Sequence, residues 1–204
     1  MLVSVHMEQV DNFKFLGTQI TCDRRPDYEL RHTVNKANQV YHQLSRSIVG
    51  KSEISEKAKM RVYKTIFQPV LMYGTESLTL LDKHRSRFQS CEMRYLRRAA
   101  GRTRRDRVRN TTIRAQFQQV SITEEMERKA LGWYGHVVRM KEDRKPRDVM
   151  EARPEGRRRR GRPRLEWEGY VERLAAQRGL SINDKKRLAQ NRREFRKWLV
   201  EPDA

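Results

Sequence analysis

Apolar residues recur every three or four positions along much of this chain, and no other sequence feature restricts its fold as strongly. The clearest run consists of Leu30, Val34, Ala37, Tyr41, Leu44 and Ile48. Side chains at this spacing lie on one face of an α-helix, because the helix turns once in about 3.6 residues. The sequence therefore predicts a mainly α-helical protein.

Two more helices of the same kind are expected, and together the three predict a helical bundle over residues 26–101. Ser52 or Ser55 can cap the second helix, because a serine side chain accepts a hydrogen bond from a free helical N–H group. Gly101 is placed to stop the third helix, which begins near Asp82. The apolar positions of the second helix are Ala58, Val62, Ile66 and Val70, widened by Tyr63 and Phe67, and those of the third are Phe88, Cys91, Tyr95 and Ala99.

The N-terminal segment, residues 1–25, has a different pattern. Val3 and Val5 alternate with polar residues, as do Phe13 and Phe15. Alternation with a period of two predicts strands, so we expect a short β-hairpin that ends at Leu16-Gly17.

Three further regions follow the bundle. Residues 102–140 predict a basic connector and two helices, the second starting at a capping box of Ser121 and Glu124. Residues 141–164 contain three prolines and two glycines and little that could be buried, so they predict an extended Arg/Pro/Gly linker. Residues 165–204 predict two closing helices. The apolar positions of these regions are Ile113, Phe117, Val120, Met126, Ala130, Trp133 and Val137, then Trp167, Val171, Leu174, Leu188, Phe195, Trp198 and Leu199.

Positive charge is concentrated in two segments. The formal net charge is +20, and it comes mainly from residues 85–109, with ten Arg against two acids, and from residues 139–164, with twelve Arg or Lys against five acids. Such segments repel themselves in a compact protein unless a polyanion neutralises them. RNA or DNA is therefore the expected partner. A solvated basic face and an anionic membrane surface are the alternatives.

Other classes of protein lack support in the sequence. No apolar run approaches the roughly 20 residues that a membrane-spanning helix requires, and no basic segment precedes an apolar one at the N-terminus. The only cysteines, Cys22 and Cys91, have no metal-ligand spacing and form no disulfide framework. We expect an intracellular protein, nuclear or cytoplasmic, that does not bind membranes.

Residues for catalysis are also missing. The sequence has no GxxxxGK[ST] phosphate loop, no GxSxG motif and no carboxylate cluster for metal-dependent phosphoryl transfer. The acidic pairs Glu124-Glu125 and Glu142-Asp143 are expected to be structural. His136 is the best single candidate for a chemical role, but we expect it to be packed and hydrogen-bonded. No catalytic residue, cofactor or metal ion is therefore predicted.

The chain contains, in order, six segments that form one pattern: FKFLG at 13–17, KMRVYKTIFQPVLMYGTE at 59–76, YLRRAAG at 95–101, RDRVRNTTI at 105–113, GWYGHVVRM at 132–140 and RRGRPRLEW at 159–167. Together these segments resemble the C-terminal part of the endonuclease–reverse transcriptase polyprotein of LINE-type, non-LTR retrotransposons. Each motif alone is weak. The resemblance is strong because it covers almost the whole chain in the family's order.

The resemblance implies that residues 1–25 are the primer grip of an RNA-directed DNA polymerase and that residues 26–101 are its thumb. Lys14 would then reach a phosphate of the primer, and Gly17 would allow close approach of the backbone. The thumb would close over the template–primer hybrid. Its candidate contacts, including two in the adjoining connector, are Arg94, Arg97, Arg98, Arg105 and Arg107, and a solvated arginine face is the alternative.

The chain departs from this family at several points. The catalytic Tyr-x-Asp-Asp signature and the endonuclease domain both belong upstream of the primer grip. This chain is therefore expected to bind template–primer without its own polymerase active site, and the palm domain would be its partner within a longer protein. Leu78 stands where the family usually has Trp, and Arg24 stands where it commonly has Gly.

The second basic segment has a motif of its own. The run RGRP at 160–163 matches the core of an AT-hook, whose flat extended backbone fits the narrow minor groove of A·T-rich DNA. The family carries a similar GRPR run before a Trp, which favours inheritance from the retroelement. The candidate contacts are Arg157, Arg158, Arg159, Arg160, Arg162 and Arg164, which could equally form a nuclear localisation signal.

Two alternatives to a reverse transcriptase fragment follow from these observations. One is a host-recruited DNA-binding protein that uses the AT-hook-like run. The other is a degenerate open reading frame with no selected function.

Overall fold

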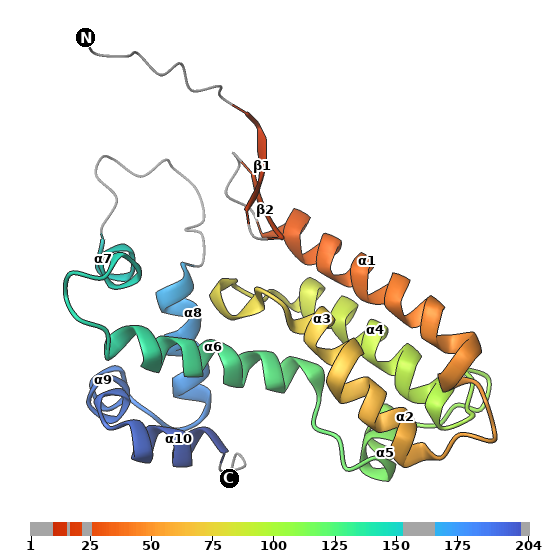
Figure 1. Cartoon of the computed structure of the whole chain (residues 1–204). Coiled ribbons are helices and arrows are strands. Elements are labelled where there is room, and N and C mark those ends of the chain that lie inside the picture. The colour runs from red at the N-terminus through yellow and green to blue at the C-terminus, as the bar shows by residue number, and fades with distance from the viewer. Residues whose placement is uncertain (1–9, 16, 22–25, 153–165, 201–204) are drawn as a thin grey trace.

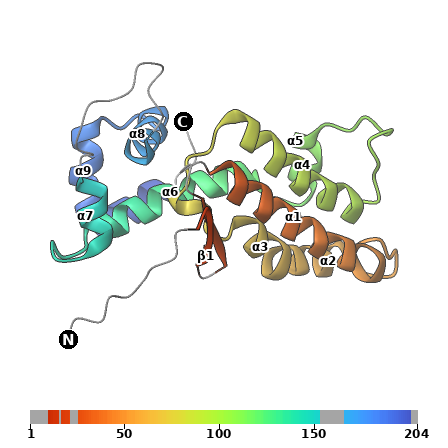
Figure 2. The same ribbon diagram turned by 90° about the horizontal axis from the view of Figure 1, so that it is seen from above.

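The computed structural model describes residues 10–15, 17–21, 26–152 and 166–200, and these residues are mainly α-helical, as predicted. One group of helices comprises α1 (Asp27–Leu44), α2 (Glu56–Val62), α3 (Gln68–Met72), α4 (Asp82–Ala99) and α5 (Asn110–Gln116). A second group comprises α7 (Lys145–Glu151), α8 (Trp167–Gln177), α9 (Ile182–Gln190) and α10 (Arg192–Val200). The long helix α6 (Ile122–Val138) runs through both groups, as Figures 1 and 2 show.

A two-stranded hairpin precedes α1. Its strands, β1 (Asn12–Phe15) and β2 (Thr18–Thr21), pair antiparallel. The hairpin lies one strand later than predicted, because Gly17 lies between the two strands instead of at the end of the second. Gly17 has a φ of +86°, which glycine adopts without steric cost in a tight turn. The other expected strand lies in residues 1–9, outside the described residues.

The core of the first group is built around aromatic rings. The ring centroid of Tyr95 in α4 lies 4.8 Å from that of Phe67 and 5.2 Å from that of Tyr63, and all three side chains are fully buried. The Tyr95 hydroxyl donates to the Lys59 carbonyl oxygen at 2.8 Å, so its polar end is satisfied in the core. The predicted apolar face of α4 is confirmed, since Phe88, Cys91, Tyr95 and Ala99 are all buried.

Two π-helical turns change which residues face this core. One follows α1 at Ser45–Val49, and the other joins α2 to α3 at Tyr63–Phe67. A π-helical turn holds more residues than an α-helical turn, so it rotates the side chains that follow it. Val49 is therefore fully buried at the position where the even spacing of the sequence predicted Ile48.

The predicted apolar face of the second helix is wrong in part. Ala58 and Ile66 are exposed. Tyr63 and Phe67 are fully buried, as predicted, and Met60, Leu71 and Met72 also face the core. Tyr63 and Phe67 determine which side of this helical segment faces the core, because large aromatic rings bury more apolar area than Ala58 and Ile66 would.

The end of α4 agrees with the prediction. Gly101 has a φ of +64°, and its N–H group donates to the Arg98 carbonyl oxygen at 3.2 Å. The next N–H group, of Arg102, donates to the Arg97 carbonyl oxygen at 2.8 Å. This pair of bonds is a Schellman motif, which satisfies the last carbonyl groups of the helix and turns the chain away from its axis.

The start of α6 is bonded differently from the expected capping box. Ser121 makes no side-chain bond to the helix backbone, and its hydroxyl lies 2.9 Å from that of Thr123. The Ile122 N–H group instead donates to Glu92 Oε1 in α4 at 3.0 Å. A distant buried carboxylate therefore replaces the local cap that the Ser121 and Glu124 pattern predicted.

The linker predicted as extended over residues 141–164 contains a helix, α7. Pro146 lies in its first turn, where the missing N–H group costs no hydrogen bond. Arg147 Nε donates to Glu151 Oε1 at 3.2 Å, one helical turn away. The prolines predicted an extended segment, but Pro146 lies at the start of α7, where a helix tolerates proline. Residues 153–165 lie outside the described residues.

The last predicted helix is divided into α9 and α10. The Ser181 hydroxyl caps α9 as expected, accepting from the Asp184 N–H group at 3.2 Å. At Asn191 the backbone becomes extended, and the Asn191 side-chain oxygen accepts from the Arg193 N–H group at 3.1 Å. Asparagine favours this local bonding over a continuous helix, so it ends one helix and starts the next.

Asp27 ties the start of α1 to the start of α4 and makes a testable contribution to stability. Its Oδ1 atom accepts from His84 Nε2 at 2.9 Å and lies 2.5 Å from Lys83 Nζ. The Leu81 N–H group donates to His84 Nδ1 at 3.2 Å, so the ring hydrogen faces Asp27. The hydrogen bond from His84, and then that from Lys83, lower the pKa of Asp27 to about 2.

Asp27→Asn should therefore destabilise the protein by about 1 to 2 kcal/mol near neutral pH, allowing for the partial exposure of the site. A carboxylate whose pKa is lowered by folding stabilises the folded state above its unfolded pKa. That contribution is lost as the pH falls from 3.8, the unperturbed value, through about 2. Urea unfolding of both proteins across this pH range tests the expectation. A difference that does not shrink with acid would contradict it.

Candidate nucleic-acid interface

The polar face of α4 forms one wall of a groove. Because α4 buries Phe88 and Tyr95, the residues on its other side point away from the core. Tyr41 of α1 and the connector after α4 complete the groove, which has a volume of about 580 Å³. The residues that line this arginine groove are Tyr41, Ser86, Gln89, Ser90, Met93, Arg94, Arg97, Arg98, Arg102, Thr103, Arg104 and Asn110.

Hydrogen bonds within the protein hold two of the groove arginines in place. Arg97 Nη2 donates to the Asn110 side-chain oxygen at 2.5 Å and to the Val108 carbonyl oxygen at 3.3 Å. Arg94 Nη1 donates to the Asn38 side-chain oxygen at 2.8 Å. Each guanidinium has five N–H groups, so both arginines keep donors that face the groove.

Arg98 owes its position to a glycine. A Cβ atom added to Gly50, in the loop after α1, would lie 2.5 Å from Arg98 Nη2 and 2.7 Å from the Ser45 carbonyl oxygen. Any side chain at position 50 would therefore collide with the arginine and with the backbone. Glycine at this position lets α4 bring Arg98 against the end of α1.

The groove carries positive charge without an acidic counterpart. Five arginines line it, at positions 94, 97, 98, 102 and 104, and no acidic residue does. Within the part of the chain that the structure describes, none of the five has a carboxylate oxygen within 4.0 Å. Converging cations that form no ion pair with a carboxylate produce a positive potential that attracts a polyanion.

A nearby acid shapes the connector. Asp106 Oδ2 accepts from the Thr103 N–H group at 2.6 Å and from the Thr103 hydroxyl at 3.2 Å. These bonds and the neighbouring Arg102 lower the pKa of Asp106. The loop is thereby closed so that Arg102 and Arg104 line the groove, while Arg105 and Arg107 are exposed outside it.

The structure brings some of the predicted contact residues together and separates others. Arg94, Arg97 and Arg98 all line the groove. Lys14 and Gly17 belong to the hairpin, where the Gly17 carbonyl oxygen accepts from Lys36 Nζ of α1 at 3.0 Å. Neither residue lines the groove. Residues Arg157, Arg158, Arg159, Arg160, Arg162 and Arg164 lie outside the described residues.

Arg102 and Arg104 also line the groove and were not predicted as contact residues. Both belong to the first basic segment, but helical spacing ends at Gly101. The connector is instead shaped by bonds that helical spacing does not reveal, from Thr103 to Asp106 and from Arg97 to Val108 and Asn110. A short Thr-x-x-Asp pattern was the one available signal, since threonine and aspartate commonly bond within such turns.

The two side chains with potential reactivity have ordinary environments. His136, expected to be packed, is exposed on α6, with its ring centroid 5.4 Å from that of Trp133. Cys91 is buried, its Sγ atom lies 3.4 Å from the Asn38 side-chain oxygen, and burial raises the pKa of its thiol to about 11. Across the described ranges, no three or more His, Cys, Asp or Glu side chains are grouped to hold a metal ion.

Comparisons of this chain with protein-family models, with curated proteins and with solved structures gave no match. Among the described helices, none combines the length and the apolar character needed to cross a bilayer.

Proposed function

We propose that this chain binds nucleic acid through the arginine groove, as the thumb of a LINE-type reverse transcriptase holds its template–primer hybrid, without catalysing synthesis. The observation that carries the proposal is the convergence of five arginines without an acidic partner on one groove of about 580 Å³. The six sequence segments that resemble the family support the choice of an RNA–DNA hybrid as ligand.

The chemistry of the groove suits a phosphate backbone. A guanidinium presents paired N–H groups in a plane, which match two oxygens of one phosphate. Arg94 and Arg97 are already oriented by Asn38 and Asn110, so little side-chain entropy is lost when they bind. Neutralised phosphates release their counterions, and binding should therefore weaken steeply as salt is added.

The test is fluorescence anisotropy of a short labelled RNA–DNA hybrid over a series of salt concentrations. The variant Arg94→Gln/Arg102→Gln/Arg104→Gln should bind about thirtyfold more weakly, and the slope of log K against log salt should fall by roughly 2 to 3. Arg97 is left unchanged because its bonds to Val108 and Asn110 hold the connector.

The matched control is Arg31→Gln/Arg193→Gln/Arg196→Gln, which removes the same charge from exposed positions outside the groove. It should lose less than about threefold in affinity, since distant exposed charges are screened by salt. Equal losses in the two variants would contradict a role for the groove. If instead only Arg160→Ala/Arg162→Ala weakens binding, and only to A·T-rich duplex, the AT-hook-like alternative is correct.

The same preparations test the absence of synthesis. The family's Tyr-x-Asp-Asp motif does not occur in this sequence, so we expect no incorporation of deoxynucleotides on a primed RNA template. Incorporation by the pure protein would overturn the non-catalytic part of the proposal.

A further inference from the structure

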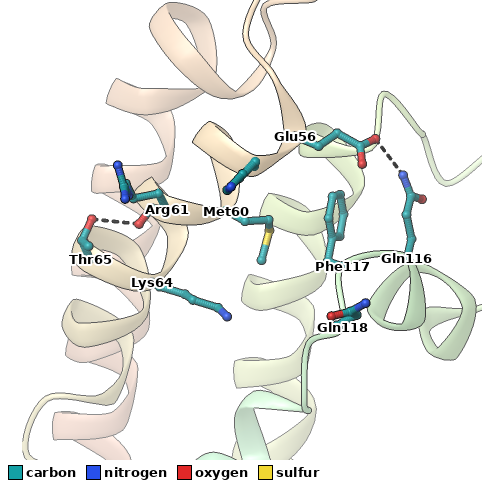
Figure 3. Close-up of a pocket in the computed structure, with 9 residues that line it drawn as sticks. Glu56, Met60, Arg61, Lys64, Thr65, Gln116, Phe117 and Gln118 are labelled. Carbon is teal, nitrogen blue, oxygen red and sulfur yellow. Dashed lines mark hydrogen bonds between the residues drawn. The ribbon is translucent and has the colours of Figure 1, made fainter.

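A second hollow lies between α2 and the end of α5, and it shares no lining residue with the arginine groove. Its volume is about 520 Å³. Figure 3 shows Met60 on α2 and Phe117 after α5 side by side across the gap, with Glu56 and Gln116 joined at its rim. The Gln116 side-chain N–H group donates to Glu56 Oε1 at 2.8 Å, which ties the two walls together.

The base of this hollow is apolar and partly aromatic. Met60 is buried, with 9% of its surface exposed, and the Phe117 ring is half-buried and packed against the core. A half-buried aromatic ring can stack on flat ligands, and the thioether of methionine adapts to their edges. The base of the hollow therefore suits a planar ring system.

Cations surround this surface. Lys57, Arg61 and Lys64 also line the hollow, and their spacing of four and three residues puts them on one side of α2 and the π-helical turn. All three side chains are exposed, and no ion pair joins any of them to an acid in the described ranges. The single acid of the hollow, Glu56, is engaged by Gln116.

An unusual backbone conformation adds an amide to the rim. Gln118 has a φ of +48°, a left-handed conformation that glycine adopts without strain. It stands at the turn that ends α5, where the Gln119 N–H group donates to the Arg114 carbonyl oxygen at 2.9 Å. Glutamine at this position supplies a side-chain amide to the hollow, and Lys64 extends toward it in Figure 3.

We propose that this hollow binds one nucleotide unit, with the base stacked on Phe117, the phosphate held by Lys57 and Lys64, and the base edge hydrogen-bonded by Gln118. A planar apolar surface, unpaired cations and an amide that both donates and accepts are the three features that nucleotide recognition requires. The site goes beyond the proposed function, because it would bind a nucleotide even if the arginine groove bound no hybrid. The nucleotide can be free or part of a single strand.

The probe is a 5′-phosphorylated trinucleotide that carries the fluorescent base 2-aminopurine, whose emission falls on stacking. The full chain should quench it, and Phe117→Leu should weaken binding about tenfold, because loss of base–aromatic stacking is the main change. Phe117→Tyr retains a ring and should bind as the unchanged protein does. Lys57→Gln/Lys64→Gln should also weaken binding about tenfold and reduce its salt dependence.

Two further measurements distinguish a free nucleotide from a single strand, and this hollow from the arginine groove. Competition with adenosine monophosphate identifies the source, since full competition indicates a free nucleotide and weak competition indicates a strand. The arginine groove variant should bind the trinucleotide normally while losing the hybrid, which separates failure of this site from failure of the proposed function.

The proposal is overturned if Phe117→Leu binds the trinucleotide as tightly as the unchanged protein. It is also overturned if a short glutamate peptide of equal charge competes as well as the trinucleotide, because the hollow would then be a general anion site. Circular dichroism of each variant shows whether the helices are intact.

Discussion

Replacing Glu92 with glutamine should lower the free energy of unfolding by about 3 kcal/mol, because it leaves a largely buried guanidinium without its counter-charge. The Glu92 side chain is completely buried, and its Oε2 atom lies 2.5 Å from Nη2 of Arg114, which is 14% exposed. Its Oε1 atom accepts from the Ile122 N–H group at 3.0 Å and from the Tyr63 hydroxyl at 3.4 Å. One carboxylate thus bonds to α5, to the start of α6 and to the core.

Burial and charge pairing act on Glu92 in opposite directions. Burial raises the pKa of the Glu92 carboxyl, while the Arg114 guanidinium and the Ile122 N–H group oppose that rise. Glutamine can still accept from Ile122 and Tyr63, so the substitution removes mainly the charge pairing with Arg114. Leaving one charge of a buried pair uncompensated typically costs about 3 to 5 kcal/mol.

Urea unfolding of Glu92→Gln, Arg114→Gln and the double variant measures the coupling. The double variant should be more stable than the sum of the single losses predicts by about 2 kcal/mol, since both charges are then absent. Glu124→Gln is the matched control, because Glu124 pairs with Arg128 at 3.4 Å but is 42% exposed. It should cost under about 0.5 kcal/mol. A similar cost for Glu92→Gln would refute the structural role assigned to Glu92.

Gly135→Ala should destabilise the protein by about 2 to 3 kcal/mol through overpacking. Gly135 is buried in α6, and a Cβ atom there would overlap the ring of Phe195 from α10. That ring is 2% exposed and cannot move aside, with the Arg139 guanidinium 5.9 Å from its centroid. The missing side chain at position 135 is what lets α10 pack closely on α6.

Gly132→Ala in the same helix is the matched control. A Cβ atom at position 132 would lie 3.8 Å from Leu199 Cδ1, which is ordinary van der Waals contact. Alanine should stabilise the helix there by about 0.5 to 1 kcal/mol, because glycine is a poor helix former. The melting temperature and the urea midpoint should therefore both fall for Gly135→Ala and both rise for Gly132→Ala. Shifts of the same sign would contradict the proposed packing of Phe195.

Local spacing predicts most of this fold, and contacts between distant residues decide the rest. The face of α4 is predicted correctly because Phe88, Tyr95 and their neighbours keep a helical period throughout a long helix. The face of α2 is predicted less well, since the π-helical turn at Tyr63–Phe67 has no spacing signal. The bond from Ile122 to Glu92 joins residues 30 positions apart, so a pattern near Ser121 could not reveal it.

The candidate site is likewise predicted only where helical spacing extends. Helical spacing places Arg94 and Arg97 on the polar side of α4, and both line the groove. Beyond Gly101 helical spacing carries no information, and the connector is shaped by bonds from Thr103 to Asp106 and from Arg97 to Val108 and Asn110. The hollow at Phe117 was not predicted, because helical spacing placed that ring among the apolar positions of a helix.

The course of α6 has a consequence for how the protein unfolds. Its first turns place Ile122 and Met126 in one group of helices, and its last turns place Tyr134 and Val137 among the other. Each group therefore lacks part of its apolar core unless the whole of α6 is helical. The two groups of helices share α6. We therefore expect them to unfold as one cooperative unit, because unfolding of either group exposes the part of α6 that the other group needs.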